Sequence, residues 1–435
     1  MKTKNILKCF VAVIALLTYS CSSDSDGDGG TPTPGTGGSG ITSITVSASN
    51  SSIELGGSVT FTVTANDGSN VTSNSTILIN NSSIQGVSFT PTATGTYVVR
   101  ATNGSLSSAN INLEVTPPVI VALRVESNDA SIKVGDTADF IVIGTDAAGN
   151  DYTITSEATV SVNGTQIDGN RYMATAAGSI DATATKDGVI SSVFTLPVTA
   201  ETAPATFAKN AIIEDFTGTW CGWCPRVSYA IEQVEAQTDR VFPIAAHVGD
   251  GMENSYSSAL DAVYVTSGYP TAVINRDATW TYPEPSNVAQ ATNLATGTTT
   301  SGLSLNSMVV GNNLQVYVSA AFTQSTPGAK LVVLVLEDGI LANQGNYTSY
   351  YGGADPIVQF EHNHTLRHAI TNVFGDAIPN TSANSKYDQV YTIPVPALVS
   401  DRDKMSIVAM IVGSNDKVIN ATGAHVGVDK DYQAN

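Results

Sequence analysis

Charge and cysteine are both scarce in this sequence. Only 13% of its 435 residues are charged, and 19 basic residues stand against 38 acidic ones, which gives a formal charge of −19. Nucleic acid binding needs a basic surface, so this balance argues against nucleic acid as a partner. Ser, Thr, Asn and Gly fill most polar positions, a composition typical of an exported, β-rich protein. The length exceeds what one core can organise, and three or four domains are expected.

Long apolar runs are missing too, apart from a short one near the N-terminus. Three lysines precede the apolar stretch 10–17, which is too short to span a bilayer. Cys21 follows soon after, directly behind a serine. This arrangement resembles a bacterial lipoprotein signal over 1–20, with Cys21 as the lipidated first residue of the mature chain. The alternative is an ordinary cleaved secretory signal followed by an unrelated cysteine.

The four cysteines leave a single candidate thiol pair. Cys9 departs with the leader and Cys21 carries the lipid, so Cys221 and Cys224 remain. This count excludes a disulfide-stapled scaffold and a four-cysteine zinc site. The sequence predicts no cofactor.

The N-terminal half contains a domain-sized repeat behind a tether. Residues 21–40 are rich in Ser, Asp, Gly and Pro, which predicts a disordered tether. Beyond them, 41–117 and 118–200 look like two copies of one module, since the pattern of 52–61 recurs at 131–140. Alternating apolar and polar residues between Gly, Asn and Asp turns predict a β-sandwich for each copy. The modules resemble bacterial Ig-like domains and are expected to act as spacers.

The C-terminal half changes pattern twice. Residues 205–298 follow the order β-α-β-α-β-β-α, which predicts an α/β domain of thioredoxin-like topology. Residues 299–435 return to short strands and predict a C-terminal β-sandwich of jelly-roll or Ig-like type. The expected fold class is therefore multidomain, with two Ig-like sandwiches, an α/β domain and a C-terminal sandwich. The stretch 337–384 is rich in Tyr and Gly, and connections of that length are often functional.

Cys221 and Cys224 stand where a buried strand is predicted to end and a helix to begin. Unpaired N–H groups and the dipole of a helix N-terminus stabilise a thiolate, the reactive form of cysteine. The pair is therefore predicted to be a redox-active disulfide, in which Cys221 attacks and Cys224 resolves the mixed disulfide. A permanent structural disulfide is the alternative.

The surroundings of this pair strengthen the likeness to thioredoxin. Asp215 lies six residues before Cys221 and resembles that family's buried proton-exchanging carboxylate, although the adjacent Glu214 takes the role if the register differs by one. Trp220 matches the tryptophan before the first cysteine, and Pro270 of Tyr-Pro-Thr matches the cis-proline. The predicted site comprises catalytic Cys221, Cys224, Asp215 and Pro270, and substrate-binding Trp220, Trp223 and Tyr269.

A histidine-rich run at 361–368 is the second candidate site. His364 and His368 are four residues apart, which is zinc-ligand spacing on a helix, but no acid–base glutamate stands between them. Structural polar residues are favoured over a metal site, and metal binding by His362, His364 and His368 stays open. His247 is predicted to be a core histidine, with tuning of the thiols as the alternative.

From residue 205 onward the chain resembles the Bacteroidetes outer-membrane proteins of the twenty-eight-kilodalton type. The likeness is carried by Glu-Asp-Phe-Thr-Gly-x-Trp-Cys-Gly-x-Cys-Pro, Tyr-Pro-Thr and His-Asn-His-x-Leu-Arg. It implies a lipid-anchored outer-membrane protein facing the periplasm or the cell surface. Two functions follow as hypotheses. One is a thiol–disulfide oxidoreductase acting on thiols or disulfides of exported proteins; the other is a surface binding protein or adhesin with a structural disulfide.

Overall fold

The computed structural model describes residues 40–434. The expected leader, the lipidated Cys21 and all but the last residue of the expected tether lie outside the described residues. The described chain divides into two compact units, one ending at Pro117 and one beginning at Pro118. The domain boundaries expected from the sequence remain predictions.

The first unit consists of two small sheets around one apolar core. Strand β3 alternates buried and exposed residues, so its valines and Phe61 all face that core. The sheets have the strand orders β1-β3-β6 and β2-β9-β7-β4-β5, with β8 beside β7. The strands are β1 (Ile44–Ala48), β2 (Ser52–Glu54), β3 (Val59–Ala65), β4 (Thr76–Ile79), β5 (Ser82–Ser83), β6 (Ser88–Phe89), β7 (Gly95–Asn103), β8 (Leu106–Ser107) and β9 (Ile111–Thr116).

The second unit begins with a similar pair of sheets. Their orders are β10-β12-β13, with β16 on β12, and β11-β19-β17-β14-β15, with β18 on β17. The five-strand order repeats that of the first unit, and its core also takes in Met308 and Tyr317 from later in the chain. The strands are β10 (Ile120–Ser127), β11 (Ile132–Lys133), β12 (Thr137–Asp146), β13 (Asp151–Thr153), β14 (Thr159–Val162), β15 (Thr165–Gln166), β16 (Arg171–Met173), β17 (Gly178–Lys186), β18 (Val189–Ile190) and β19 (Phe194–Thr199).

The rest of the second unit carries the three α-helices of the described chain. The helices are α1 (Pro225–Glu235), α2 (Ser255–Tyr264) and α3 (Val288–Thr292). The strands up to the C-terminal third are β20 (Phe207–Ala208), β21 (Ala211–Thr217), β22 (Val241–His247), β23 (Thr271–Ile274), β24 (Ala278–Thr279), β25 (Thr298–Thr299), β26 (Ser301–Val310) and β27 (Asn313–Phe322). They are followed by β28 (Lys330–Glu337), β29 (Ile340–Gln344), β30 (Ile357–His362), β31 (Thr365–Ala369), β32 (Asp376–Ala377), β33 (Ser385–Pro394), β34 (Met405–Val412) and β35 (Val418–His425).

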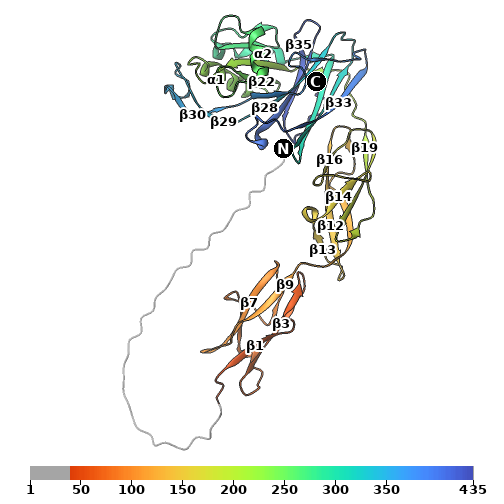
Figure 1. The fold of residues 1–435 in the computed structure, drawn as a ribbon, viewed down its shortest axis with the longest axis vertical. Helices are drawn as coiled ribbons and strands as arrows, with labels where there is room; N and C mark the ends of the chain where they lie inside the picture. The colour runs from red at the N-terminus through yellow and green to blue at the C-terminus, as the bar shows by residue number, and fades with distance from the viewer. Residues whose placement is uncertain (1–39, 435) are drawn as a thin grey trace, which may run out of the picture. The chain divides into compact units, whose positions relative to one another are not determined.

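One nine-stranded sheet organises this part of the unit (Figure 1). Its order is β24-β23-β21-β22-β31-β28-β34-β35, with β32 also paired to β28. Strands β21 and β22 run parallel, and Ala245 of β22 pairs with Thr365 of β31. The early α/β segment and the C-terminal strands therefore share one sheet.

The expected fold class is wrong on this point. The described chain is dominated by strands, and it contains no self-contained α/β thioredoxin-like domain followed by a separate C-terminal sandwich. Periodicity predicted the individual strands but carried no information on which strands pair. Backbone pairing across the β22–β31 junction merges what looked like two domains into one sheet.

The helices cover opposite faces of this sheet. Helix α1 packs Val227 and Ala230 against Ala211 and Ile213 of β21. Leu260 of α2 packs on the other face with Ile212 and Phe216, because successive strand residues alternate between faces. Strand β21 is buried along its whole length, so its polar residues are enclosed by protein.

Three further β elements complete the unit, and the smallest is the pair of β20 with β25. The sheet β26-β27-β33 packs its apolar side chains against β28 and β34. Strands β29 and β30 form a separate two-stranded hairpin, which lies beside α1 in Figure 1. None of the helices in residues 40–434 is long and apolar enough to cross a membrane.

Candidate functional site

The turn between β21 and α1 holds the predicted thiol pair. Cys221 and Cys224 are joined by a disulfide with their Cα atoms 5.4 Å apart. The N–H of Cys221 donates to the carbonyl of Gly218 at 2.9 Å, and the N–H of Cys224 donates to that of Cys221 at 3.1 Å. Pro225 begins α1, where its missing N–H costs little. The disulfide thus lies at the N-terminus of a helix, as the sequence predicts.

Both cysteines are buried, which the sequence did not predict. Cys221 is 4% exposed and Cys224 is 1% exposed. Residues 344–347, at the end of β29, pack on the backbone of this turn, and we call them the covering segment. Its Gly345 N–H donates to the carbonyl of Thr219 at 2.8 Å, and its Tyr347 N–H donates to that of Gly222 at 2.6 Å. The covering segment therefore pairs with backbone carbonyls on both sides of Cys221.

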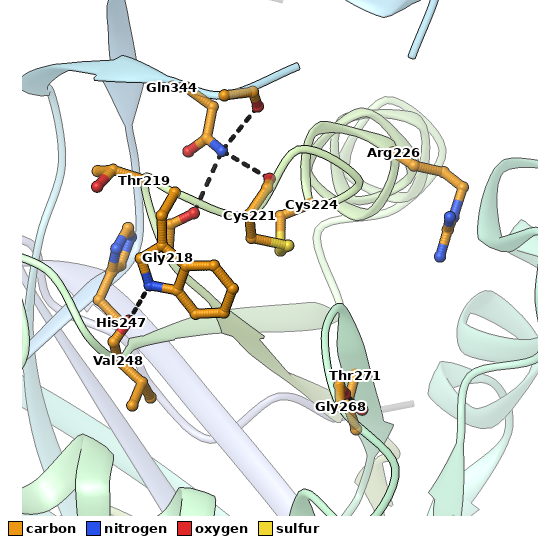
Figure 2. Close-up of a disulfide and its surroundings, with 12 residues drawn as sticks. Gly218, Thr219, Cys221, Cys224, Arg226, His247, Val248, Gly268, Thr271 and Gln344 are labelled. Atoms are coloured by element: carbon orange, nitrogen blue, oxygen red, sulfur yellow. Dashed lines mark hydrogen bonds between the residues drawn. A yellow bond between two sulfur atoms is a disulfide. The ribbon is translucent and has the colours of Figure 1, made fainter. Parts of the chain in front are cut away.

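The side chain of Gln344 adds to this clamp. Its Nε2 atom donates to the carbonyl oxygens of Cys221 at 3.0 Å and Gly218 at 3.2 Å, as Figure 2 shows. Gly222 is required beneath the segment, since a Cβ atom there would lie 2.4 Å from the Tyr347 ring. Gln344 is itself 2% exposed, so its three carbonyl contacts are shielded from water.

The residues that follow the covering segment contact helix α1. The ring of Tyr350 stacks on Tyr229 with centroids 4.3 Å apart, and the Tyr351 hydroxyl donates to Glu232 at 2.7 Å. Asp355 accepts the N–H of Asn346 at 3.0 Å. The long Tyr- and Gly-rich connection flagged by the sequence therefore packs on both the disulfide turn and helix α1.

Exposed aromatic rings surround the covered disulfide. Trp220 and Trp223 are 50% and 51% exposed, and Tyr347 is 62% exposed. Trp220 packs edge-to-face on Tyr269 at 5.2 Å, and Trp223 does the same on Tyr347 at 5.9 Å. The peptide bond between Tyr269 and Pro270 is cis, as expected. The structure therefore brings all three predicted substrate-binding aromatics to the turn.

Asp215 faces α1, whereas the preceding residue, Glu214, faces α2. Asp215 lies between Ala245 of β22 and Ala272 of β23 and is 2% exposed. Its Oδ1 atom is buried and has no hydrogen-bond partner among the described residues. Burial, and secondarily the negative charge of Glu284, raise the pKa of Asp215 to about 8. The carboxyl is therefore mostly protonated at neutral pH.

A small cavity of about 60 Å³ connects Asp215 to the helix that carries the disulfide. Ser228 of α1 also lines it, and Ser228 lies one helical turn after Cys224 on the same helix face. His362 lines the cavity as well; it is 5% exposed and its Nε2 atom has no partner among the described residues. Burial, and secondarily the nearby His247, lower the pKa of His362 to about 4, so it is neutral at pH 7. The polar lining and volume suit one or two water molecules.

His247 supports the turn through Asp250. Its Nδ1 atom lies 2.8 Å from Asp250 Oδ2, and the same oxygen accepts the N–H of Thr219 at 2.8 Å. Burial opposes the ionisation of Asp250, but the hydrogen bond and charge of His247 outweigh it and lower the Asp250 pKa. Sequence reasoning missed Asp250, whose role depends on a loop folding back onto the turn.

The histidine-rich run is not helical, although His362 and His364 both line the cavity beside Asp215. Residues 365–369 form strand β31, so the helical face expected for His364 and His368 does not exist. His362 packs on His247, His364 lies 3.1 Å from Glu235, and His368 lies 3.1 Å from the Tyr256 hydroxyl. Within residues 40–434, no cluster of three or more His, Cys, Asp or Glu residues has the geometry to hold a metal ion.

Comparisons with known proteins point to the outer membrane. Residues 257–430 match the family model of outer membrane protein Omp28. This match supports the outer-membrane localisation expected from the sequence. It includes the covering segment but begins after the disulfide turn. No curated protein matches the chain.

Several solved structures are similar to parts of the chain. HBP35 of Porphyromonas gingivalis is 19% identical with a TM-score of 0.41, over 53% of this chain and 79% of that one. Adhesin InvE of Yersinia pseudotuberculosis is 15% identical with a TM-score of 0.21, over 36% and 58% of the two chains. Domains 5–6 of the S-layer protein SbsC are 16% identical with a TM-score of 0.17, over 36% and 98%. These scores are too low to establish a shared fold.

Proposed function

We propose that this protein is a thiol–disulfide oxidoreductase of the outer membrane, anchored by a lipid on Cys21. It exchanges the Cys221–Cys224 disulfide with thiols or disulfides of exported proteins. Trp220, Trp223 and Tyr269 form the surface that meets the partner beside Pro270. The direction of net electron flow depends on the reduction potential of the pair relative to its partners.

The buried, unpartnered carboxyl of Asp215 carries this proposal. A carboxylate with no ionic partner in the interior destabilises the fold, and a structural disulfide has no use for it. A redox disulfide has a use for such a carboxyl, because its resolving thiol must gain and lose a proton in each exchange. Asp215 faces the helix that begins at Cys224, and its raised pKa lies near that of a thiol.

The exchange balances without another reactant. A partner thiolate attacks Sγ of Cys221, so a new S–S bond forms and the Cys221–Cys224 bond breaks with its electron pair on Cys224. The protonated Asp215 gives its proton to the Cys224 thiolate, and water in the adjoining cavity exchanges protons with Asp215. A second partner thiolate then displaces Cys221, which leaves the partner oxidised and the protein reduced.

A surface binding protein with a structural disulfide is the second candidate. The burial of both cysteines favours it, since stable disulfides are shielded from attacking thiols. The exposed tryptophans beside the disulfide are compatible with either function.

Trapping of mixed disulfides separates the two functions. The full-length Cys224→Ser protein is incubated with oxidised exported proteins, and partners linked to Cys221 are counted after thiol blocking. The oxidoreductase accumulates such partners, because Cys224 is no longer present to resolve them. The Cys221→Ser protein is the matched control and traps far fewer, since Cys224 is the more buried sulfur. A wild-type disulfide that resists strong reductant, together with no trapped partner, would refute the oxidoreductase.

A further inference from the structure

The cavity beside Asp215 is lined by buried polar groups and by exposed charged ones. Asp215 and His362 are 2% and 5% exposed, and each has a buried side-chain atom without a partner among the described residues. Glu232, Glu235 and Glu361 line the same cavity, and all three are exposed. The cavity therefore extends from a buried carboxyl toward the surface of the protein.

A larger groove of about 390 Å³ borders this cavity. The two hollows share three lining residues, Glu235, Pro243 and His364. Proline has no exchangeable proton, whereas Nε2 of His364 lies 3.1 Å from Glu235 Oε1. The His364 side chain is 25% exposed, so it is in contact with solvent as well as with the cavity. The His364–Glu235 pair is therefore the part of the shared wall that can carry a proton.

The two ring nitrogens of His364 face different carboxylates. Nε2 faces Glu235, which lines both hollows, and Nδ1 lies 3.5 Å from Oδ1 of Asp338, which lines the groove but not the cavity. A ring that binds a proton at one nitrogen and releases one from the other suits transfer between two compartments. Burial disfavours the imidazolium, but Glu235, and then Asp338 and Asp215, outweigh it and raise the pKa of His364. The protonated form is therefore populated near neutral pH.

The backbone holds this ring at the shared wall. His364 has a φ of 56°, in the left-handed region that residues other than glycine adopt at some cost. Its N–H donates to Asp338 Oδ1 at 2.7 Å, and its carbonyl accepts the N–H of Ala245 at 2.8 Å. Glycine would take this conformation without strain but could carry no proton. Backbone strain of this kind is typical of a residue whose side chain is used.

We propose that His364 is the proton gate of Asp215 and passes protons between the open groove and the cavity. This inference rests on the proposed oxidoreductase function and adds the route by which its buried acid is reprotonated. After Asp215 has given its proton to the Cys224 thiolate, the His364 imidazolium gives a proton through cavity water to the Asp215 carboxylate. Neutral His364 then takes a proton from solvent in the groove, so the protons balance. His362 can bind the cavity water through its unpartnered Nε2 atom.

A pH jump measures this route without any turnover. The full-length protein is moved from pH 9 to pH 6, across the Asp215 pKa of about 8, and time-resolved infrared spectroscopy follows the band of the protonated carboxyl. Asp215→Asn identifies that band by its loss. His364→Gln keeps an N–H donor for Glu235 but does not titrate, and we expect Asp215 to be protonated at least about tenfold more slowly in it.

His368 provides the matched control for this substitution. It lies four residues further along the chain, where its Nδ1 atom is 3.1 Å from the Tyr256 hydroxyl, and it does not line the cavity. His368→Gln should therefore protonate Asp215 at the wild-type rate.

Glu235→Gln tests the gate through its pH dependence, and it does so even if His364→Gln fails to fold. In the wild type, the protonation rate should rise as the final pH falls through the His364 pKa. Glu235 is the strongest of the groups that raise this pKa, so its loss should move the midpoint to lower pH, which a purely structural side chain would not do. The other charged groups around His364 are unchanged: Asp338 and Asp215 face it, and Asp239, His425 and Lys430 also line the groove.

Three results would each overturn the proposal. They are a wild-type rate in His364→Gln, an unmoved midpoint in Glu235→Gln, and a slowing in His368→Gln equal to that in His364→Gln.

Failure here is distinguishable from failure of the proposed function. If Cys224→Ser traps partners while Asp215 is protonated at the wild-type rate in His364→Gln, the oxidoreductase stands and the gate does not. If His364→Gln slows protonation but Cys224→Ser traps nothing, the gate serves a carboxyl that takes no part in exchange.

Discussion

The two faces of strand β21 place neighbouring carboxyl groups in different environments. On the α2 face, Glu214 is 0% exposed and accepts two hydrogen bonds from Arg276, at 2.7 Å and 3.0 Å. On the α1 face, Asp215 is 2% exposed, and none of the described residues forms an ion pair with it. Burial is nearly equal, but one group has a guanidinium beside it and the other a small polar cavity.

This difference indicates a structural role for the Glu214 carboxyl and a chemical role for the Asp215 carboxyl. A buried charge with a guanidinium bonded to one of its oxygens fixes the geometry of its surroundings. A buried carboxyl without a partner has its pKa shifted toward neutral pH, where it can exchange a proton. The disulfide lies on the face with the titratable group. Three changes test this contrast.

The largest effect should come from breaking the pair on the α2 face. Arg276→Met leaves the Glu214 carboxylate buried without its partner, and we expect a loss of about 3–5 kcal/mol in the free energy of unfolding. Chemical denaturation followed by tryptophan fluorescence measures it, because all three tryptophans lie between residues 220 and 280. Restoring neutrality with Glu214→Leu in the same protein should recover most of the loss.

The exposed ion pair of Lys417 with Asp277 supplies the control for this change. Both side chains are about half exposed, so Lys417→Met should cost less than about 1 kcal/mol. A similar small loss in Arg276→Met would contradict a structural role for the buried pair.

Asp215→Asn should have the next largest effect, with the opposite sign. The Asp215 pKa is 3.8 before folding and about 8 in the folded protein. Between these values the folded state binds the extra proton, so stability falls by about 1.4 kcal/mol per pH unit as pH rises. At pH 7, about three pH units above the unfolded pKa, Asp215→Asn should be more stable to unfolding than the wild type by as much as about 4 kcal/mol. At pH 4 the two proteins should be almost equally stable.

Urea unfolding of the wild type and Asp215→Asn from pH 4 to pH 9 measures this difference. The exposed Asp403 offers the matched control substitution, Asp403→Asn, in the same measurement. Parallel curves for the wild type and Asp215→Asn would show that Asp215 is ionised like an ordinary surface carboxyl.

The smallest effect should come from the rim of the α1 face, where His364 lies 3.1 Å from Glu235. Burial opposes protonation of His364, but the hydrogen bond and charge of Glu235 outweigh it and raise the His364 pKa. The resulting stability is complete below pH 6.5 and is lost as pH rises through the folded pKa. Because Glu235 is 39% exposed, Glu235→Gln should cost less than about 1 kcal/mol at pH 6, in the same unfolding measurement. An equal loss at pH 6 and pH 9 would point to lost packing instead.

Local features around the disulfide were predictable. The cysteine spacing, the preceding apolar strand and Pro225 indicated a disulfide at a helix start, and the structure has one. The period-two alternation also placed Asp215 and Glu214 on opposite faces, since that rule depends on backbone geometry alone. The register that decides which of them faces α1 needed the structure.

Other predictions were wrong where the structure depends on contacts between residues far apart in the sequence. The spacing of His364 and His368 fits a helix, but pairing with β28 makes the segment a strand. The expected separate α/β domain failed for the same reason, because strand pairing joins residues more than a hundred positions apart. Gln344 reaches Cys221 across a similar distance, and a single sequence carries no signal for such contacts.

The sequence by itself determined the chemical groups: one thiol pair at a helix start, a carboxyl six residues before its first cysteine and a tryptophan directly before each cysteine. The tertiary structure decided the state of those groups. It buried Asp215 without a partner and packed residues 344–347 on the backbone of the disulfide turn. The reason is physical: a pKa and an accessible surface depend on everything packed around a group, and most of those neighbours come from distant parts of the chain.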